Sequence, residues 1–184
     1  MIMLTVPALL AAILTGTLGL AALLWSLWRP HRRLWPPRVG RRQDVISIGL
    51  TYGCFGAVVL LALAGWGGMD WPPVVRRGVG GALLVAGHVI SAVTMRQFGA
   101  RQIVGGDTGL RTEGLYRCSR NPQYLACITL LLGWAVLSAA PLVWAVLPLG
   151  LAAFAVAPLT EEPWLRATSG TAYDACAVGV RRFL

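Results

Sequence analysis

Five long apolar stretches constrain the fold of this chain more than any other feature. They cover residues 4–28, 45–66, 78–95, 124–139 and 142–158. An α-helix needs about 20 apolar residues to cross the hydrocarbon core of a bilayer. The first two stretches reach that length, and we expect the shorter three to span with little tilt or with help from flanking semi-polar residues. The sequence therefore predicts an all-α membrane protein with about five transmembrane helices.

Composition supports this prediction. Hydrophobic residues make up 57% of the chain and charged residues only 12%, whereas soluble domains carry about 25% charged residues. Residues 4–28 follow no basic segment and are too long for the apolar region of a typical signal peptide, so we expect them to be retained. Because no repeat of fixed period is present, we expect residues 1–184 to form one transmembrane domain.

The basic residues predict the orientation of the helices. All 16 are arginine: six lie in residues 29–42, five in 96–120 and three in 166–182, while only Arg76 and Arg77 fall in the remaining loop. The positive-inside rule then places the N-terminus outside and the C-terminus in the cytoplasm. The arginines serve as orientation signals that also contact anionic headgroups. We expect no nucleic-acid partner, despite the net charge of +9.

Other residue types give weaker signals. The four cysteines are scattered without a CxxC pair, and no histidine stands at metal-ligand spacing, so we expect no metal site. His88 lies inside the third apolar stretch. It is either a functional ionisable group or a neutral histidine hydrogen-bonded to a neighbouring helix. Most tryptophans, Trp35 among them, fall near predicted membrane edges and are interpreted as interfacial anchors.

The polar segment of residues 96–124 separates two apolar stretches and is where we expect chemistry. Asn121 and Pro122 predict the start of the fourth helix, because asparagine caps free backbone donors and proline suits the first helical turn. Exposed N–H groups at such a start attract carboxylate or phosphate, and Arg120 beside them strengthens that preference. This corner is therefore suited to an anionic group.

A second polar cluster follows the fifth stretch. Residues 138–141 read Ser-Ala-Ala-Pro and predict a tight turn, which returns the chain as a fifth helix. That helix brings Glu161 and Glu162 beside the start of the fourth. Adjacent carboxylates at a membrane exit must be solvated, paired with Arg117 or Arg120, or bound to a ligand such as an amine or ribose hydroxyls.

Several short motifs carry a resemblance to a known family. They are Gly-Leu-Tyr at 114–116, Arg-Asn-Pro-Gln-Tyr at 120–124, Glu-Glu-x-x-Leu at 161–165, Gly-x-x-Tyr at 170–173 and Arg-Arg-Phe-Leu at 181–184. In this order and spacing, the chain resembles the isoprenylcysteine carboxyl methyltransferase-like family, which also takes in phospholipid N-methyltransferases. The resemblance covers the C-terminal half of the chain.

The resemblance implies an S-adenosylmethionine-dependent methyltransferase. It places the cofactor at the cytoplasmic face, beside a short hairpin of helices 4 and 5, and a lipophilic acceptor enters from the bilayer. Residues 78–184 would form the catalytic core, with a cytoplasmic loop at 96–123 and a tail at 159–184, and residues 1–67 two variable spans. Implied catalytic residues are Arg120, which orients the acceptor or the cofactor carboxylate, and Glu162, which takes a proton if the acceptor is an amine. His88 is the alternative group for that proton. Implied cofactor contacts are Gln102, Thr108, Gly109, Leu110, Arg111, Tyr116, Asn121, Pro122, Gln123, Tyr124 and Glu161.

Two departures from the family pattern bear on the choice of acceptor and on the chemistry of the site. The family often has histidine where this chain has Asn121, which excludes a role for imidazole there. The prenylcysteine enzymes carry arginine four residues before the first glutamate, where this chain has Ala157, and this weighs against prenylcysteine. A phospholipid amine, a lipid carboxylate and a small hydrophobic thiol stay open as acceptors.

Two other functions compete with methyl transfer. A membrane-embedded, NADPH-dependent reductase related to the sterol reductases would share the Pro-x-Tyr element at 122–124. Such enzymes have more spans and need basic contacts for the extra phosphate. Alternatively, in a non-enzymatic scaffold or small transporter, the arginines would only set the topology and the glutamates would only pair with them.

Overall fold

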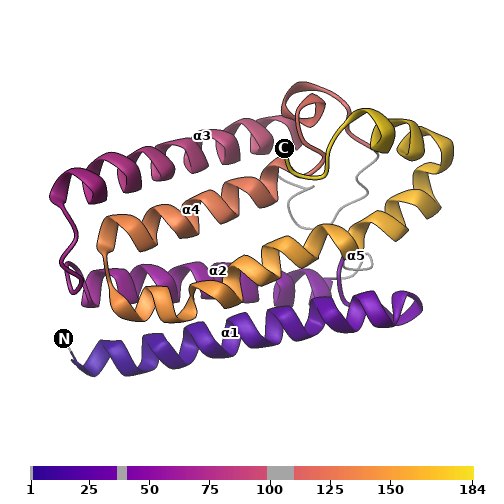
Figure 1. The fold of residues 1–184 in the computed structure, drawn as a ribbon. Helices are drawn as coiled ribbons and strands as arrows, with labels where there is room; N and C mark the ends of the chain where they lie inside the picture. The colour runs from indigo at the N-terminus through magenta and orange to yellow at the C-terminus, as the bar shows by residue number, and fades with distance from the viewer. Residues whose placement is uncertain (1, 37–40, 99–109) are drawn as a thin grey trace.

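The computed structural model describes residues 2–36, 41–98 and 110–184, which form a helical bundle (Figure 1). Its long helices are α1 (Ile2–Trp28), α2 (Arg41–Ala64), α3 (Gly81–Phe98), α4 (Pro122–Ser138) and α5 (Pro141–Gly179). A π-helical segment, Val75–Gly80, runs directly into α3, and Pro30–Arg32 and Gly114–Arg117 are short 3-10 turns. Within these described ranges there is no strand, so the all-α prediction is confirmed.

Four helical segments among the described residues are long and apolar enough to cross a membrane. They are Leu4–Trp28, Val45–Ala64, Val75–Gln97 and Pro141–Gly179. The helix α4 has 17 residues and falls short of that length, in line with the short fourth apolar stretch. Five spans with an external N-terminus therefore stay a prediction.

Small residues let the helices approach closely. A Cβ atom on Gly80 would lie 2.5 Å from the backbone nitrogen of Leu137, and one on Gly87 would lie 2.7 Å from Cγ of Leu130. The backbone of the third helical segment therefore lies directly against α4, as small residues permit in membrane bundles. Any side chain at either position would therefore meet α4.

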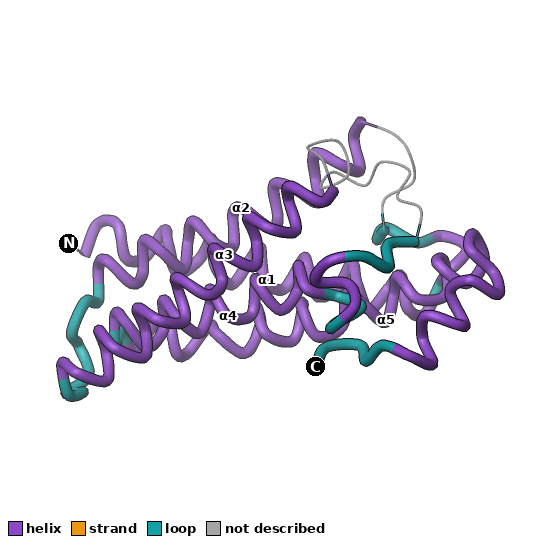
Figure 2. Tube along the Cα trace, turned by 90° about the horizontal axis from the view of Figure 1, so that it is seen from above, coloured by secondary structure: helices purple, strands orange, loops and turns teal. Residues whose placement is uncertain are grey.

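The buried core joins α1, α2, α4 and α5 and is rich in alanine. Its fully buried side chains include Leu61, Leu131 and Val143, and the rings of Phe55 and Phe154 lie 5.7 Å apart beside it. Figure 2 shows α5 running past the other helices, so that its second half lies with the loops at one end.

The predicted tight turn between α4 and α5 is confirmed. The helix α4 ends at Ser138 and α5 begins at Pro141, with Ala139 between them in a left-handed conformation (φ 48°). The preceding loop supports the turn: Gly67 N donates to the carbonyl of Ser138 at 2.7 Å, and Met69 N to that of Ala139 at 2.9 Å. The turn therefore directs α5 back along the bundle towards the loops.

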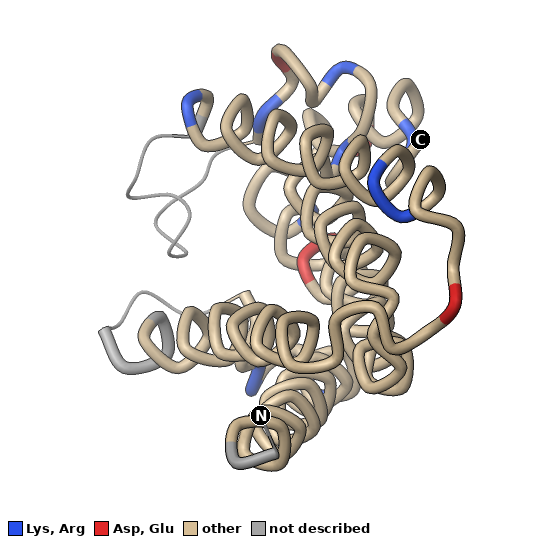
Figure 3. Tube along the Cα trace, turned by 90° about the vertical axis from the view of Figure 1, so that its left-hand side faces the viewer, with Lys and Arg blue, Asp and Glu red and all other residues tan. Residues whose placement is uncertain are grey.

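The alternating directions of the helices bring three polar segments to one end of the bundle (Figure 1). This polar end is formed by residues 29–36, 110–121 and 159–184, while the N-terminus and the α4–α5 turn lie at the opposite end. Figure 3 shows that charged positions are sparse along the helices.

Candidate functional site

Glu161 lies on α5 at the polar end, where its side chain meets two aromatic residues. Tyr124, in the first turn of α4, donates a hydrogen bond from its hydroxyl to Oε1 of Glu161. Nε1 of Trp35 lies 2.8 Å from the same carboxylate oxygen and 3.0 Å from the Tyr124 hydroxyl. Trp35 belongs to the connection between α1 and α2, so three distant parts of the chain meet at this carboxylate. Charge-assisted hydrogen bonds of this kind fix its orientation.

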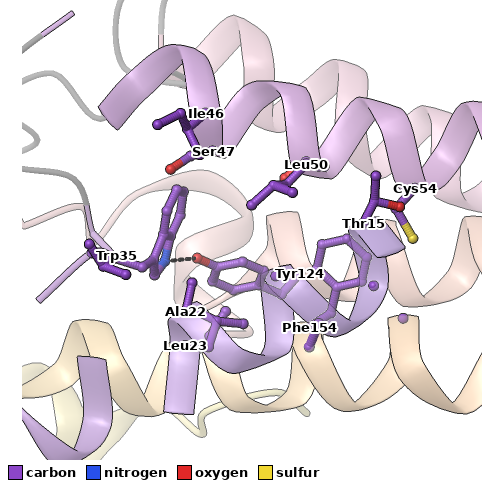
Figure 4. A pocket seen from close by; sticks show the side chains of 17 residues that line it. Thr15, Ala22, Leu23, Trp35, Ile46, Ser47, Leu50, Cys54, Tyr124 and Phe154 are labelled. Carbon is purple, nitrogen blue, oxygen red and sulfur yellow. Dashed lines mark hydrogen bonds between the residues drawn. The ribbon is translucent and has the colours of Figure 1, made fainter. Parts of the chain in front are cut away.

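A cavity of about 250 Å³ opens beside this group, between α1, α2 and α5. Figure 4 shows the ring of Tyr124 between Trp35 and Phe154, with Leu50 and Cys54 of α2 on the opposite wall. The ring centroids of Tyr124 and Phe154 lie 6.4 Å apart. The cavity therefore has a polar edge at the Trp35–Tyr124 pair and an apolar interior.

Glu162 faces different partners from its neighbour, because successive residues of an α-helix point about 100° apart. Its two carboxylate oxygens accept hydrogen bonds from Nε and Nη2 of Arg182 at 2.7 and 2.9 Å, and Nη1 of Arg120 lies 3.3 Å away. The same Nη1 donates to the hydroxyl of Tyr173 at 2.9 Å. The side chains of Glu162 and Arg120 are only 13% and 15% exposed, so water screens this ion pair weakly.

The C-terminal tail crosses the start of α4. The backbone N–H of Arg120 donates to the carbonyl of Arg181, and Nδ2 of Asn121 donates to the carbonyl of Arg182, each at 2.9 Å. The helix begins at Pro122, as predicted, but Asn121 makes no side-chain cap. The capping prediction is wrong: the side chain of Asn121 instead donates from Nδ2 to the tail. Hydrogen bonding to Glu162 raises the pKa of Arg182, which keeps the tail positively charged here.

The 3-10 turn Gly114–Arg117 brings Tyr116 into the same corner, where its side chain is buried. Burial raises the pKa of the Tyr116 phenol, the charge of Glu161 raises it further, and Arg111 opposes both. Tyr116 therefore stays a neutral hydrogen-bonding group in electrostatic range of Glu161 and of the exposed Arg111.

The other predicted cofactor contacts lie in different surroundings. Oε1 of Gln123 accepts a hydrogen bond from Oγ1 of Thr94 on α3 at 2.5 Å. Pro122 is buried and Leu110 is half-buried. Three predicted residues lie outside the described part of the chain: Gln102, Thr108 and Gly109.

His88 makes its hydrogen bond within its own helix. Its Nδ1 lies 2.7 Å from the carbonyl of Leu84, one turn earlier in α3. The hydrogen-bonded interpretation of His88 therefore fits the structure, but its partner is not on a neighbouring helix.

Comparison with known proteins decides the family. A family model described as phospholipid methyltransferase matches residues 75–171, which is more than half of the chain. The chain belongs to the phospholipid methyltransferase family. This family comprises integral membrane methyltransferases, and the resemblance seen in the sequence motifs is confirmed. No curated protein and no solved structure matches the chain.

The match to the phospholipid methyltransferase family includes every predicted site residue that the structure describes, from Leu110 to Glu162. Trp35 and Arg182 lie outside the match, and neither was predicted to belong to the site. Trp35 was expected to be an interfacial anchor, yet it contacts Glu161 across 126 positions of the chain. No local sequence pattern predicts such a contact. Arg182, in contrast, belongs to the Arg-Arg-Phe-Leu motif at 181–184, which could have pointed to it.

Proposed function

We propose that this chain transfers a methyl group from S-adenosylmethionine to a lipophilic acceptor at the cytoplasmic face of its membrane. Family membership supports methyl transfer, and the long apolar helices support an acceptor drawn from the bilayer. One observation carries the proposal: the Glu161 carboxylate lies where the arginine-rich corner meets an apolar cavity, held by residues that line that cavity. Such a boundary suits a polar cofactor and an apolar acceptor that must meet.

The groups in this corner fit the cofactor. S-adenosylmethionine has a carboxylate, which is favoured by a guanidinium group and by the N-terminal end of a helix. Arg120 stands at the start of α4, and its buried Nε has no hydrogen-bond partner among the described residues. The carboxylate of Glu161 matches an amine or the ribose hydroxyls. Arg120 and Glu161 would therefore hold opposite ends of the cofactor. Tyr116 would lie near the end held by Glu161, since it is in electrostatic range of that carboxylate.

When bound, S-adenosylmethionine supplies a methyl group on a positively charged sulfur. The protein must mainly align the acceptor and exclude water. Trp35 and Tyr124 hold Glu161 and close the polar edge of the cavity. Glu162 is bound by two arginines, which favours a role in positioning Arg120 over one in accepting a proton.

Incubation with lipids tests the proposal. The purified protein in nanodiscs would be given S-adenosylmethionine with a labelled methyl group and a membrane lipid extract. Mass spectrometry should find the label in a lipid product. Asp70→Asn serves as a control, because this exposed carboxylate lies in the loop at the opposite end of the bundle and should leave the yield unchanged.

A binding titration separates methyl transfer from the competing functions. S-adenosylhomocysteine should bind and raise the unfolding temperature, and NADPH should do neither. Binding of NADPH without S-adenosylhomocysteine would point to a reductase. Binding of neither ligand would point to a scaffold or transporter.

A further inference from the structure

The cavity between α1, α2 and α5 is suited to hydrocarbon and offers few polar groups to water. Its lining is mainly apolar and includes Gly19 of α1, Leu50 of α2 and Phe154 of α5. Cavities with such linings stay dry and bind apolar molecules. Because these helices are long and apolar enough to cross a membrane, the available apolar molecules are the chains of lipids.

One edge of this cavity is polar. Trp35 and Tyr124 both line the cavity, and both hydrogen-bond to Glu161. A molecule with its chain in the cavity would therefore place its polar end beside a carboxylate. The geometry selects an amphiphile whose head can donate a hydrogen bond.

The volume of the cavity limits the chain that it holds. The cavity of about 250 Å³ is finite, so it can bury only a limited number of methylene groups of a chain.

The two N-terminal spans contribute most of this cavity. Of its 17 lining residues, five lie inside the family match at 75–171 and the other twelve precede it. The shape of the cavity therefore depends mainly on residues that precede the family match. The corner around Arg120 and Glu161, in contrast, lies inside the match.

We infer that this cavity binds one hydrocarbon chain of the methyl acceptor, places the head at its polar edge beside Trp35 and Tyr124, and sets the preferred chain length. The identity of the occupant as the acceptor rests on the proposed function, whereas the binding of a chain does not. A single-chain amphiphile and one chain of a diacyl lipid share this chemistry.

Titration of the wild-type protein with n-alkylamines of increasing length tests the binding of a chain. The measurement is made by calorimetry without a methyl donor. Each buried methylene should increase the affinity about fourfold, and the gain should stop once the chain fills the cavity. An affinity that does not depend on chain length, or that rises without a plateau as it would for partition into detergent, would overturn the inference.

A matched pair of variants locates the chain. A Cβ atom on Gly19 or on Gly56 meets nothing within 4 Å, so the packing around either glycine leaves room for a larger side chain. Gly19 lines the cavity, and Gly56 is an exposed position of α2 that does not. Because leucine fills space that the chain would use, Gly19→Leu should move the plateau to chains shorter by about four carbons. Gly56→Leu should keep the wild-type profile. An unchanged plateau in Gly19→Leu would place the chain elsewhere.

Competition distinguishes the two sources of the chain. A lysophosphatidylethanolamine that displaces octylamine, where its diacyl counterpart does not, identifies a single-chain acceptor. Displacement by both identifies one chain of a diacyl lipid, and displacement by neither contradicts the inference. Absence of methyl transfer to any lipid of the extract, while the chain-length profile persists, would overturn the proposed function and leave the binding of a chain intact.

Discussion

At the scale of single residues, two adjacent carboxylates have separate surroundings. Trp35 and Tyr124 hold Glu161, whereas Glu162 binds Arg182 and Arg120. This division predicts that the two glutamates affect different measurable properties when each is replaced by glutamine.

Glu161→Gln should weaken cofactor binding more than Glu162→Gln does. Hydrogen bonds to charged groups contribute about 1.5–3 kcal/mol, so the dissociation constant for S-adenosylhomocysteine should rise about tenfold or more in the first variant. Glu162→Gln should instead lower the free energy of unfolding by about 1–3 kcal/mol, because it weakens a largely buried ion pair that also anchors the tail. Calorimetric titration and thermal unfolding measure the two effects.

Asp70→Asn is the control for both measurements, since it makes the same chemical change at an exposed site and should alter neither. If Glu162→Gln raised the dissociation constant more while Glu161→Gln unfolded more easily, the assignment of the two carboxylates would be reversed.

At the scale of helices and turns, short sequence motifs predicted the features that depend only on neighbouring residues, such as the start of a helix. Pro122 fixes the backbone angle of a first helical turn, and α4 begins there. The fifth apolar stretch ends at residue 158 because polar residues begin there, but the helix continues past it. Its backbone is non-helical at Gly170 (φ 53°), and a second helical part then runs to Gly179. The contact of Trp35 with Glu161 depends on how α1, α2 and α5 pack, which no local pattern encodes.

The packing of the third helical segment on α4 gives a sharp prediction about one methyl group. A Cβ atom on Gly80 would lie 2.5 Å from backbone nitrogen and 2.7 Å from Cα of Leu137, and backbone atoms cannot move aside as a side chain can. Gly80→Ala should therefore lower the free energy of unfolding by about 1–3 kcal/mol, the usual cost of overpacking. Thermal unfolding in detergent measures the loss.

Gly78→Ala is the matched control. Gly78 lies in the same π-helical segment, and a Cβ atom there meets nothing within 4 Å. Alanine also has the higher helix propensity, so this variant should be as stable as the wild type or slightly more so. Equal losses of unfolding free energy in both variants would show that the loss in Gly80→Ala does not come from contact with α4.

At the scale of the whole molecule, the fold gathers the arginine-rich segments at one end. Residues 29–33, 111–120 and 166–182 meet at the polar end, and the loop with Asp70 lies at the other (Figure 1). If the positive-inside rule orients this bundle, the polar end faces the cytoplasm, where S-adenosylmethionine is made available. A wrong orientation would separate the proposed site from its cofactor.

Cysteine labelling measures this orientation directly. Cys118 is exposed at the polar end and Asp70 is exposed at the other. In a background with Cys54, Cys127 and Cys176 replaced by serine, a membrane-impermeant maleimide should label Cys118 only after the cells are permeabilised. With Cys118 also replaced, Asp70→Cys should be labelled in intact cells. The opposite pattern would place the polar end outside, because an impermeant reagent reaches only the external face, and would contradict a cytoplasmic site.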